Sequence, residues 1–325
     1  MFKIDTRIKQ EALNFAVLMN CLKVTEPKFD PLFESFLSET KATGAIIENL
    51  ELYSRYFKVD EVLLTREYTL ALSQFSKLKE TDEIIKRGTS DYPEMLATTE
   101  KAPRFLYIRG RKSLLYETRK VSLVGSRNAS DRAKYNTTRL AQKLGKNGIT
   151  VISGLAKGID VTAHRAVLDL GLNTIAVIGT HLNQYYPSEN KAVQLQIEKQ
   201  GLVVSQFSPA AKTQRWFFPM RNRVMSALSL ATVVMEAGET SGSLIQADYA
   251  LQQGRLVLLP ESALKNESIS WPEKLVKKGA KVMTNPSEAL SILAESQLFK
   301  EKLDVETFEM YDTHLDTNYQ FDIMP

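Results

Sequence analysis

The stretch TVISGLAKGID, residues 150 to 160, decides the fold. Its first three residues are β-branched, which is typical of a buried strand. Small residues follow through Gly158, and a helical pattern begins near Asp160. Asp160 is well placed to cap that helix, because a carboxylate can accept from the free N–H groups at a helix N-terminus. The stretch therefore predicts one unit of strand, turn and helix.

The same order repeats on both sides of this unit. Apolar, β-branched runs predict further buried strands, and helical stretches lie between them. The expected strands are 121–124, 150–152, 174–178, 202–204, 232–235 and 256–259, and the expected helices are 131–146, 161–170, 189–199, 223–228 and 244–253. This βαβ series predicts an α/β fold with a Rossmann-like, doubly wound parallel sheet. Ligands of such sheets bind at the carboxyl edge of the strands.

The segments around this core have a different character. Residues 1–90 predict an N-terminal helical segment, with apolar residues spaced at three and four in 12–22 and 62–78. Residues 91–120 predict a linker that includes a short strand at 105–108 and leads into the domain at 121–296. Residues 297–325 form an acidic tail, which we expect to be loosely ordered.

The net charge of +4 hides a sharp asymmetry along the chain. Residues 1–100 carry a net charge of −4, residues 101–260 a net charge of +13, and residues 261–325 a net charge of −5. A basic module between acidic segments favours a polyanionic partner, because lysine and arginine release condensed counterions when they meet phosphates. A generally basic soluble surface remains the alternative on charge alone.

Composition limits the cellular setting and the chemistry. The single cysteine, Cys21, excludes an internal disulfide, which fits a reducing cytoplasm. No run approaches about 18 uninterrupted apolar residues, so we expect a cytoplasmic protein without a membrane segment. The three histidines are far apart in sequence, and no His/Asp/Glu cluster has the spacing of metal ligands. The sequence predicts no cofactor and no metal site.

Two turns after expected strands combine small residues with one cation each. The first is Gly125-Ser126-Arg127, in which the arginine offers a planar fork suited to phosphate. The second contains Ser153, Gly154 and Lys157; a lysine among small residues has little packing to do. His164, one turn into the next helix, could contact a ligand or could simply be packed near the turn.

Two later segments offer similar chemistry. Arg221, Asn222 and Arg223 precede an apolar helical run; the two arginines can line one groove only if Arg221 lies in the loop or the first helical turn, which Pro219 favours. Just upstream, the aromatic residues 216–218 could stack on bases or pack in the core. Ser241, Gly242 and Ser243 form another small-residue turn at a helix N-terminus, where a phosphate could bind.

Five motifs, taken in order, resemble the DprA/Smf DNA-processing family over residues 92–283. They are Val124-Gly125-Ser126-Arg127, Ser153 to Asp160 with Ala163-His164, Tyr186-Pro187 with Asn190, Phe218 to Arg223, and Ser241 to Leu244 with Gln253-Gly254-Arg255. The chain departs from the family pattern at 179–183, at Gln206, at Gln246 and over 260–275. These departures indicate a divergent member.

The resemblance implies a Rossmann-like protein, often a homodimer, that binds single-stranded DNA and helps to load RecA in recombination or natural transformation. It places the basic pocket at the turns described above. Carried over position by position, the DNA-binding residues are Ser126, Arg127, Lys157, Arg221, Asn222, Arg223 and Arg255. The turns and the resemblance thus point to the same residues. We expect these residues to form one basic groove that binds DNA without catalysing a reaction.

Two alternatives use the same phosphate-binding turns. A nucleoside monophosphate phosphoribohydrolase-like enzyme would need a Gly-Gly-x-Gly-Thr loop, which 238–244 lacks, although Glu236 and Glu239 keep the possibility open. A nucleotide-binding sensor is the other, because phosphate-binding turns do not distinguish a strand from a mononucleotide.

Overall fold

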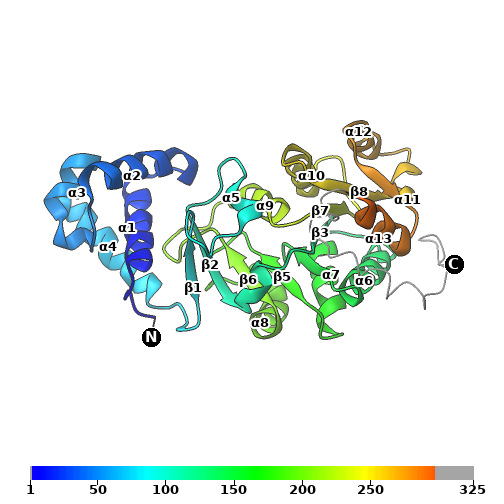
Figure 1. Ribbon diagram of the computed structural model, residues 1–325, viewed down its shortest axis with the longest axis horizontal. Coiled ribbons are helices and arrows are strands. Elements are labelled where there is room, and N and C mark those ends of the chain that lie inside the picture. The colour runs from blue at the N-terminus through cyan, green and yellow to red at the C-terminus, as the bar shows by residue number, and fades with distance from the viewer. Residues whose placement is uncertain (1, 297–325) are drawn as a thin grey trace. The chain divides into compact units, whose positions relative to one another are not determined.

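The computed structural model describes residues 2–296, which form two compact units (Figure 1). Unit 1 contains Met1–Arg109, Ile178–Gln184 and Val204–Phe217. Unit 2 contains Gly110–Val177, Tyr185–Val203 and the chain from Phe218 onward. The acidic tail expected at 297–325 lies outside the described residues.

The strands of unit 2 have the order β6-β5-β4-β3-β7-β8-β9, and of β6 only residues 202 and 203 belong to this unit. Its strands are β3 (Lys120–Val124), β4 (Thr150–Ser153), β5 (Thr174–Val177), β6 (Leu202–Ser205), β7 (Ala231–Val234), β8 (Leu256–Pro260) and β9 (Lys281–Met283). The pairs from β5 to β9 are parallel, and Val121 of β3 lies in register with Val151 of β4 and Ala231 of β7. All six strands expected in this region are present, and the predicted Rossmann-like α/β fold is confirmed; β9 was not predicted.

Helices cover both faces of this sheet, as a doubly wound fold requires. Figure 1 shows α6 to α8 on one side of the strands and α9 and α10 on the other. The helices are α6 (Asp131–Lys146), α7 (Ile159–Leu168), α8 (Lys191–Gln200), α9 (Phe217–Ala227), α10 (Gly242–Gln252), α11 (Glu261–Leu264), α12 (Trp271–Lys277) and α13 (Pro286–Glu295), with short 3₁₀ turns η2 (Lys112–Leu115) and η3 (Ser188–Asn190). Within residues 2–296, no helix is both long enough and apolar enough to cross a membrane.

Unit 1 begins with helices, as the N-terminal periodicity predicts. These are α1 (Arg7–Leu22), α2 (Glu26–Thr40), α3 (Leu50–Phe57) and α4 (Glu61–Phe75), with the 3₁₀ turn η1 (Ile46–Glu48). Their core is aromatic: the Phe36 ring centroid lies 4.7 Å from that of Tyr53 and 4.9 Å from that of Phe57. Two antiparallel strands follow, β1 (Glu83–Lys86) and β2 (Phe105–Gly110), separated by α5 (Glu94–Ala97). The expected strand at 105–108 lies in β2, whereas β1 was not predicted.

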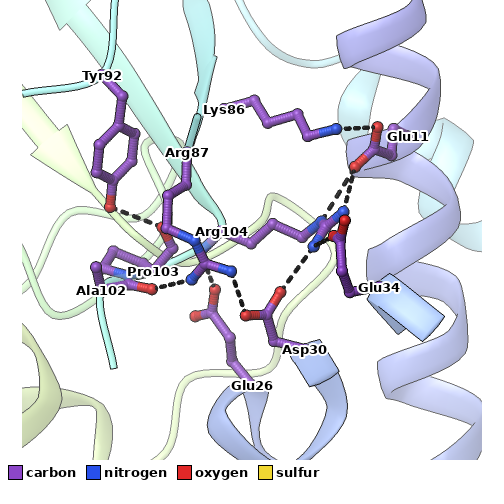
Figure 2. A network of polar contacts seen from close by, with 10 residues as sticks. All are labelled: Glu11, Glu26, Asp30, Glu34, Lys86, Arg87, Tyr92, Ala102, Pro103 and Arg104. Carbon is purple, nitrogen blue, oxygen red and sulfur yellow. Dashed lines mark hydrogen bonds and ion pairs between the residues drawn. The ribbon is translucent and has the colours of Figure 1, made fainter. Parts of the chain in front are cut away.

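A buried arginine forms hydrogen bonds that link the first two helices of unit 1 to its strands (Figure 2). Arg104, 2% exposed, donates to Glu11 of α1 at 2.9 Å and to Asp30 of α2 at 2.9 Å. Its own backbone N–H donates to the Glu26 carboxylate at 2.6 Å. Arg87, next to β1, donates to the second oxygen of Asp30 at 2.5 Å. A buried guanidinium needs such partners, because an unpaired charge in the interior is strongly destabilising.

Candidate nucleic-acid interface

The turn after β3 is held by two neighbouring segments of unit 2. The Ser126 N–H donates to the Glu236 carbonyl at 2.7 Å, and the Ser126 carbonyl accepts from the Ile159 N–H at 3.2 Å. A Cβ at Gly125 would lie 2.6 Å from the Ile159 side chain, so glycine is required for this close approach. These contacts fix the backbone of the turn, while the Arg127 side chain is exposed.

The turn after β4 lies directly against the turn after β3. Gly158 has a φ of 71°, and a Cβ there would lie 2.7 Å from the Arg127 carbonyl oxygen. Ser153 is fully buried, and its hydroxyl donates to the Leu123 carbonyl at 2.6 Å. Ser153 therefore links β4 to β3. The same turn carries the cation Lys157, next to Gly158.

Lys157 is exposed and already has a carboxylate partner. Its Nζ lies 2.7 Å from Glu189 Oε2, and both side chains are about half exposed, at 51% and 54%. Exposed pairs of this kind contribute only about 0 to 1 kcal/mol, so a phosphate can replace the carboxylate at little cost.

Asn190 supports the backbone of the same turn. Leu155 is buried with a φ of 57°, and the Asn190 amide donates to its carbonyl at 3.0 Å. Asn190 was expected only as part of a motif; its burial and its hydrogen bond to a left-handed residue identify it as a positioning residue. The expected capping position of Asp160 is wrong, because the N-cap of α7 is Gly158. Asp160 lies in the first turn of the helix and accepts from the Ala156 N–H at 3.4 Å.

Arg221 is buried and bonded to backbone carbonyls at the ends of two strands. Its Nη1 donates to the carbonyls of Gly154 and Val177, each at 2.5 Å. A side chain at Gly154 would overlap the guanidinium. Burial lowers the pKa of Arg221 to about 10, against the opposing effect of Asp160, so the side chain is charged at neutral pH. Burial also raises the pKa of Asp160, and the charge of Arg221 opposes that shift.

The expectation that Arg221 lies in a loop or in the first turn of a helix is wrong. Helix α9 begins at Phe217 rather than at 223, so Arg221 is its fifth residue. The reason is that Pro219 is the third helical residue, where the missing N–H would have no partner in the helix. Arg223 consequently points elsewhere, with its guanidinium 4.8 Å from the centroid of the Tyr249 ring.

The turn after β7 forms an open helix N-terminus. Ser241 is the N-cap of α10, and its hydroxyl lies 2.7 Å from that of Ser243. Gly242 is exposed, and its carbonyl accepts from the Asn222 amide at 3.1 Å. Asn222 also accepts from Arg221 Nε at 3.0 Å, so it connects α9 to the start of α10.

The structure thus brings most of the predicted residues together in unit 2 through direct contacts. Hydrogen bonds or close approaches link the turn after β3 to those after β4 and β7, Gly154 to Arg221, and Asn222 to Gly242. Arg127 and Lys157 are the exposed cations of this set, whereas Arg221 is buried. Arg223 is partly exposed and lies on the Tyr249 ring. This arrangement presents exposed guanidinium and ammonium groups beside backbone N–H groups, which is chemistry suited to phosphates.

Residues considered for catalysis have structural partners. His164 is fully buried with its Nδ1 2.7 Å from the Thr174 hydroxyl, and burial lowers its pKa to about 3, so it is neutral. Glu236 accepts from the Ser130 N–H at 2.9 Å and from its hydroxyl at 2.5 Å. Glu239 accepts from the Trp271 N–H at 3.3 Å at the start of α12. Among the described residues, no group of three or more His, Cys, Asp or Glu side chains could hold a metal ion.

Comparison with known protein families and sequences gives consistent results. Residues 83–294 match the family model described as DNA recombination-mediator protein A. DNA processing protein DprA of Streptococcus pneumoniae is 35% identical over 237 residues, which cover 73% of this chain and 79% of that protein. DprA of Bacillus subtilis is 35% identical over 208 residues, covering 64% and 70%. Protein Smf of Escherichia coli is 35% identical over 211 residues, covering 65% and 56%.

Two solved structures are similar to this one. The X-ray structure of DprA from Streptococcus pneumoniae aligns with a TM-score of 0.70 and 29% identity, over 90% of this chain and 98% of that one. A structure of DNA processing protein A from Helicobacter pylori, described for its single-stranded DNA binding mode, aligns with a TM-score of 0.59 and 26% identity. That alignment covers 66% of this chain and 96% of the other.

Proposed function

The chain belongs to the DNA recombination-mediator protein A family, and on this premise we propose that it binds single-stranded DNA at the carboxyl edge of β3, β4 and β7. The observation that carries the proposal is Arg127, exposed on a turn that two neighbouring segments of unit 2 hold in place. Among residues 2–296, no carboxylate pairs with Arg127. An exposed guanidinium that lies on a fixed turn, without an ion-pair partner among these residues, is well suited to a backbone phosphate.

In this proposal, some of the other predicted residues contact the DNA, and the rest hold the contacting groups in place. Lys157 is a second phosphate contact, because its exposed pair with Glu189 is easily exchanged. Gly242 offers the N–H group of a helix N-terminus, whereas the Ser243 N–H already donates to the capping Ser241 hydroxyl at 3.4 Å. Arg221 and Asn222 hold the strand ends and the start of α10, and Arg221 adds a buried positive charge. Their contribution is to position the groups that meet the DNA.

In unit 1, the aromatic segment upstream of α9 offers a base-stacking residue. Phe217 is buried and stacks on Phe207 with a centroid distance of 3.8 Å and an interplanar angle of 2°. Trp216 is 41% exposed and is held edge-on to Phe217 at 4.5 Å. Lys212 and Arg215 are exposed in the same segment. A rigid exposed indole beside cations is a typical way to hold a base and its phosphate, so we assign base stacking to Trp216.

We also propose a wider role, which the description of the family as recombination mediators supports. In this proposal the protein helps to load RecA on single strands during recombination or natural transformation. We further propose that it works in the cytoplasm as a homodimer and by binding rather than catalysis. The hydrogen bonds of Glu236 and Glu239 to backbone N–H groups support a structural role for both carboxylates.

The test is equilibrium binding to a labelled single strand of about 30 nucleotides and to its duplex, across a series of salt concentrations. Arg127→Gln should weaken binding to every sequence by about tenfold and reduce the slope of log affinity against log salt by about 1. Trp216→Ala should weaken binding by about tenfold without changing that slope, and Trp216→Phe should retain most of the affinity.

Lys199→Gln is the matched control, because Lys199 lies in the last turn of α8 and α8 ends just before β6 begins, at the amino edge of the sheet. It should leave the affinity nearly unchanged. Unchanged affinity and salt slope in Arg127→Gln, or equal binding of the duplex, would reject the proposed site.

A further inference from the structure

A cavity of about 450 Å³ lies at the carboxyl edge of the sheet in unit 2, at the point where the strand order reverses. From β3 the chain continues to β4, β5 and β6 on one side, whereas β7, β8 and β9 lie on the other. Residues at or just after the ends of β3, β7 and β8 line the cavity, among them Ser126, Glu236 and Pro260. In doubly wound sheets, ligands bind in the crevice at this reversal. The volume falls in the range of about 300 to 1,000 Å³ typical of small-molecule sites.

The walls of the cavity differ in chemistry. One wall is a face of α6, where Arg132 and Asn136 are one helical turn apart and Ala133 leaves room between them. Another part of the lining contains Ser262, Ala263 and Asn266, which follow β8. Trp271 and Ile269 add apolar surface. The Trp271 Nε1 donates to the Ala237 carbonyl at 2.8 Å, which fixes the plane of the indole.

We propose that this cavity binds one nucleotide, as a base with its sugar and a monophosphate. Arg132 is the one cation among its lining residues, which favours a single phosphate over a triphosphate. Glu236 repels a phosphate but accepts from sugar hydroxyls or from the N–H groups of a base. The phosphate therefore lies toward Arg132 and the sugar and base toward Glu236. Asn266, whose Oδ1 already accepts from Ser268, can donate from its Nδ2 to the edge of the base.

This ligand could be a free mononucleotide or one nucleotide of a bound strand, because Ser126 belongs both to the cavity lining and to the turn that carries Arg127. Binding of a free mononucleotide does not depend on the proposed DNA-binding role, whereas binding of a strand nucleotide rests on it. Lys157 and Arg221 to Arg223, which belong to that role, do not line it. Titration with mononucleotides therefore tests the cavity separately from strand binding.

The experiment titrates the full chain with dAMP, AMP and dTMP by calorimetry and by tryptophan emission, in which Trp271 reports on the cavity. Ala133→Leu fills the cavity from α6, and Ser262→Leu narrows it from the segment that follows β8 at a partly exposed position, in case the first variant unfolds. Arg132→Gln removes the cation. Lys134→Gln is the control, since Lys134 lies on the same helix and pairs with Asp131 rather than lining the cavity.

We expect at least one mononucleotide to bind, and binding to weaken at least tenfold in Arg132→Gln and in both leucine variants but not in Lys134→Gln. If mononucleotides fail but the leucine variants weaken strand binding at least fivefold, the strand supplies the nucleotide and the proposal stands. If no mononucleotide binds at millimolar concentration and the folded leucine variants bind the strand normally, the proposal is overturned. Failure of the proposed function looks different, because the unmodified protein would then not bind the strand.

Discussion

Gly158 satisfies two requirements at once, and they can be separated by mutation. Its φ of 71° disfavours any other residue, and a Cβ there would collide with backbone oxygens of Ser126 and Arg127. Gly171 has a similar φ of 67° but open space around it. We expect Gly171→Ala to lower the free energy of unfolding by about 1 kcal/mol, and Gly158→Ala to lower it by about 3 kcal/mol or more. Urea denaturation measures both; equal losses would show that the close approach of the two turns is unimportant.

Glu26 gives unit 1 a pH dependence with a definite sign. Burial raises the pKa of its carboxyl from 4.5 to about 7, while the Arg104 N–H, Arg87 and Arg104 favour the charged form and Asp30 opposes it. Because the pKa is higher in the folded state, unfolding releases a proton between about pH 4.5 and 7. Stability contributed by this group therefore falls as the pH rises through that window.

We expect Glu26→Gln to be more stable than the unmodified protein by about 1 to 3 kcal/mol at pH 8 and nearly equal to it at pH 4.5. The glutamine carbonyl can still accept from the Arg104 N–H. His164, whose pKa burial lowers to about 3, acts in the opposite direction in acid, but it is present in both proteins and cancels in the difference. Urea unfolding at the two pH values measures this difference. A constant difference between them would contradict the assignment.

At the scale of elements, one side chain links α9 to the ends of two strands. Arg221 donates to two carbonyls, of Gly154 after β4 and of Val177 at the end of β5, and to Asn222 within α9. A lysine retains the charge but cannot reproduce the planar set of donors. We expect Arg221→Lys to lower the free energy of unfolding by about 3 kcal/mol, because buried carbonyls lose their partners.

Arg223→Lys is the matched control, since its guanidinium lies on the Tyr249 ring at a partly exposed position. We expect Arg223→Lys to lower the free energy of unfolding by less than about 1 kcal/mol. Thermal unfolding compares the two variants. Similar losses of unfolding free energy in the two variants would mean that the carbonyl contacts of Arg221 stabilise the fold no more than a cation at the surface does.

Elements were predictable from sequence where local patterns were strong. The parallel strands of unit 2 were expected because apolar β-branched runs are typical of buried strands, and the helix expected at 131–146 has these bounds in α6. β1 was missed because two isoleucines between charged residues, Glu83 and Lys86, do not look like a strand until β2 pairs with them. β9 has three residues, too few for a periodic pattern.

The candidate site was predictable only in part. Arg127 follows a strand directly, so its exposure on a turn could be expected from sequence. The burial of Arg221 could not, because it depends on carbonyls of Gly154 and Val177 that are distant in sequence. The same is true of the bond between Ser130 and Glu236. The sequence therefore located the loops of the candidate site. The structure was needed to propose which of their residues contact DNA and which hold the others in place.

At the scale of the whole molecule, charge is unevenly distributed along the chain. Residues 101–260 carry a net charge of +13, whereas 301–325 hold seven carboxylates and one lysine. Deleting 301–325 therefore raises the net charge from +4 to +10. Long-range attraction of a polyanion grows with net positive charge and is screened over about 10 Å at 0.1 M salt.

We expect this deletion to tighten single-strand binding by about three- to tenfold at 20 mM salt and by less than about twofold at 0.5 M. The slope of log affinity against log salt should accordingly become steeper. A full-length variant with the seven carboxylates replaced by amides is the control, and net charge alone predicts the same gain. A gain from the deletion that the amide variant does not reproduce would point instead to a specific contact made by 301–325. Unchanged affinity at low salt in both variants would contradict any electrostatic effect of these residues on DNA binding.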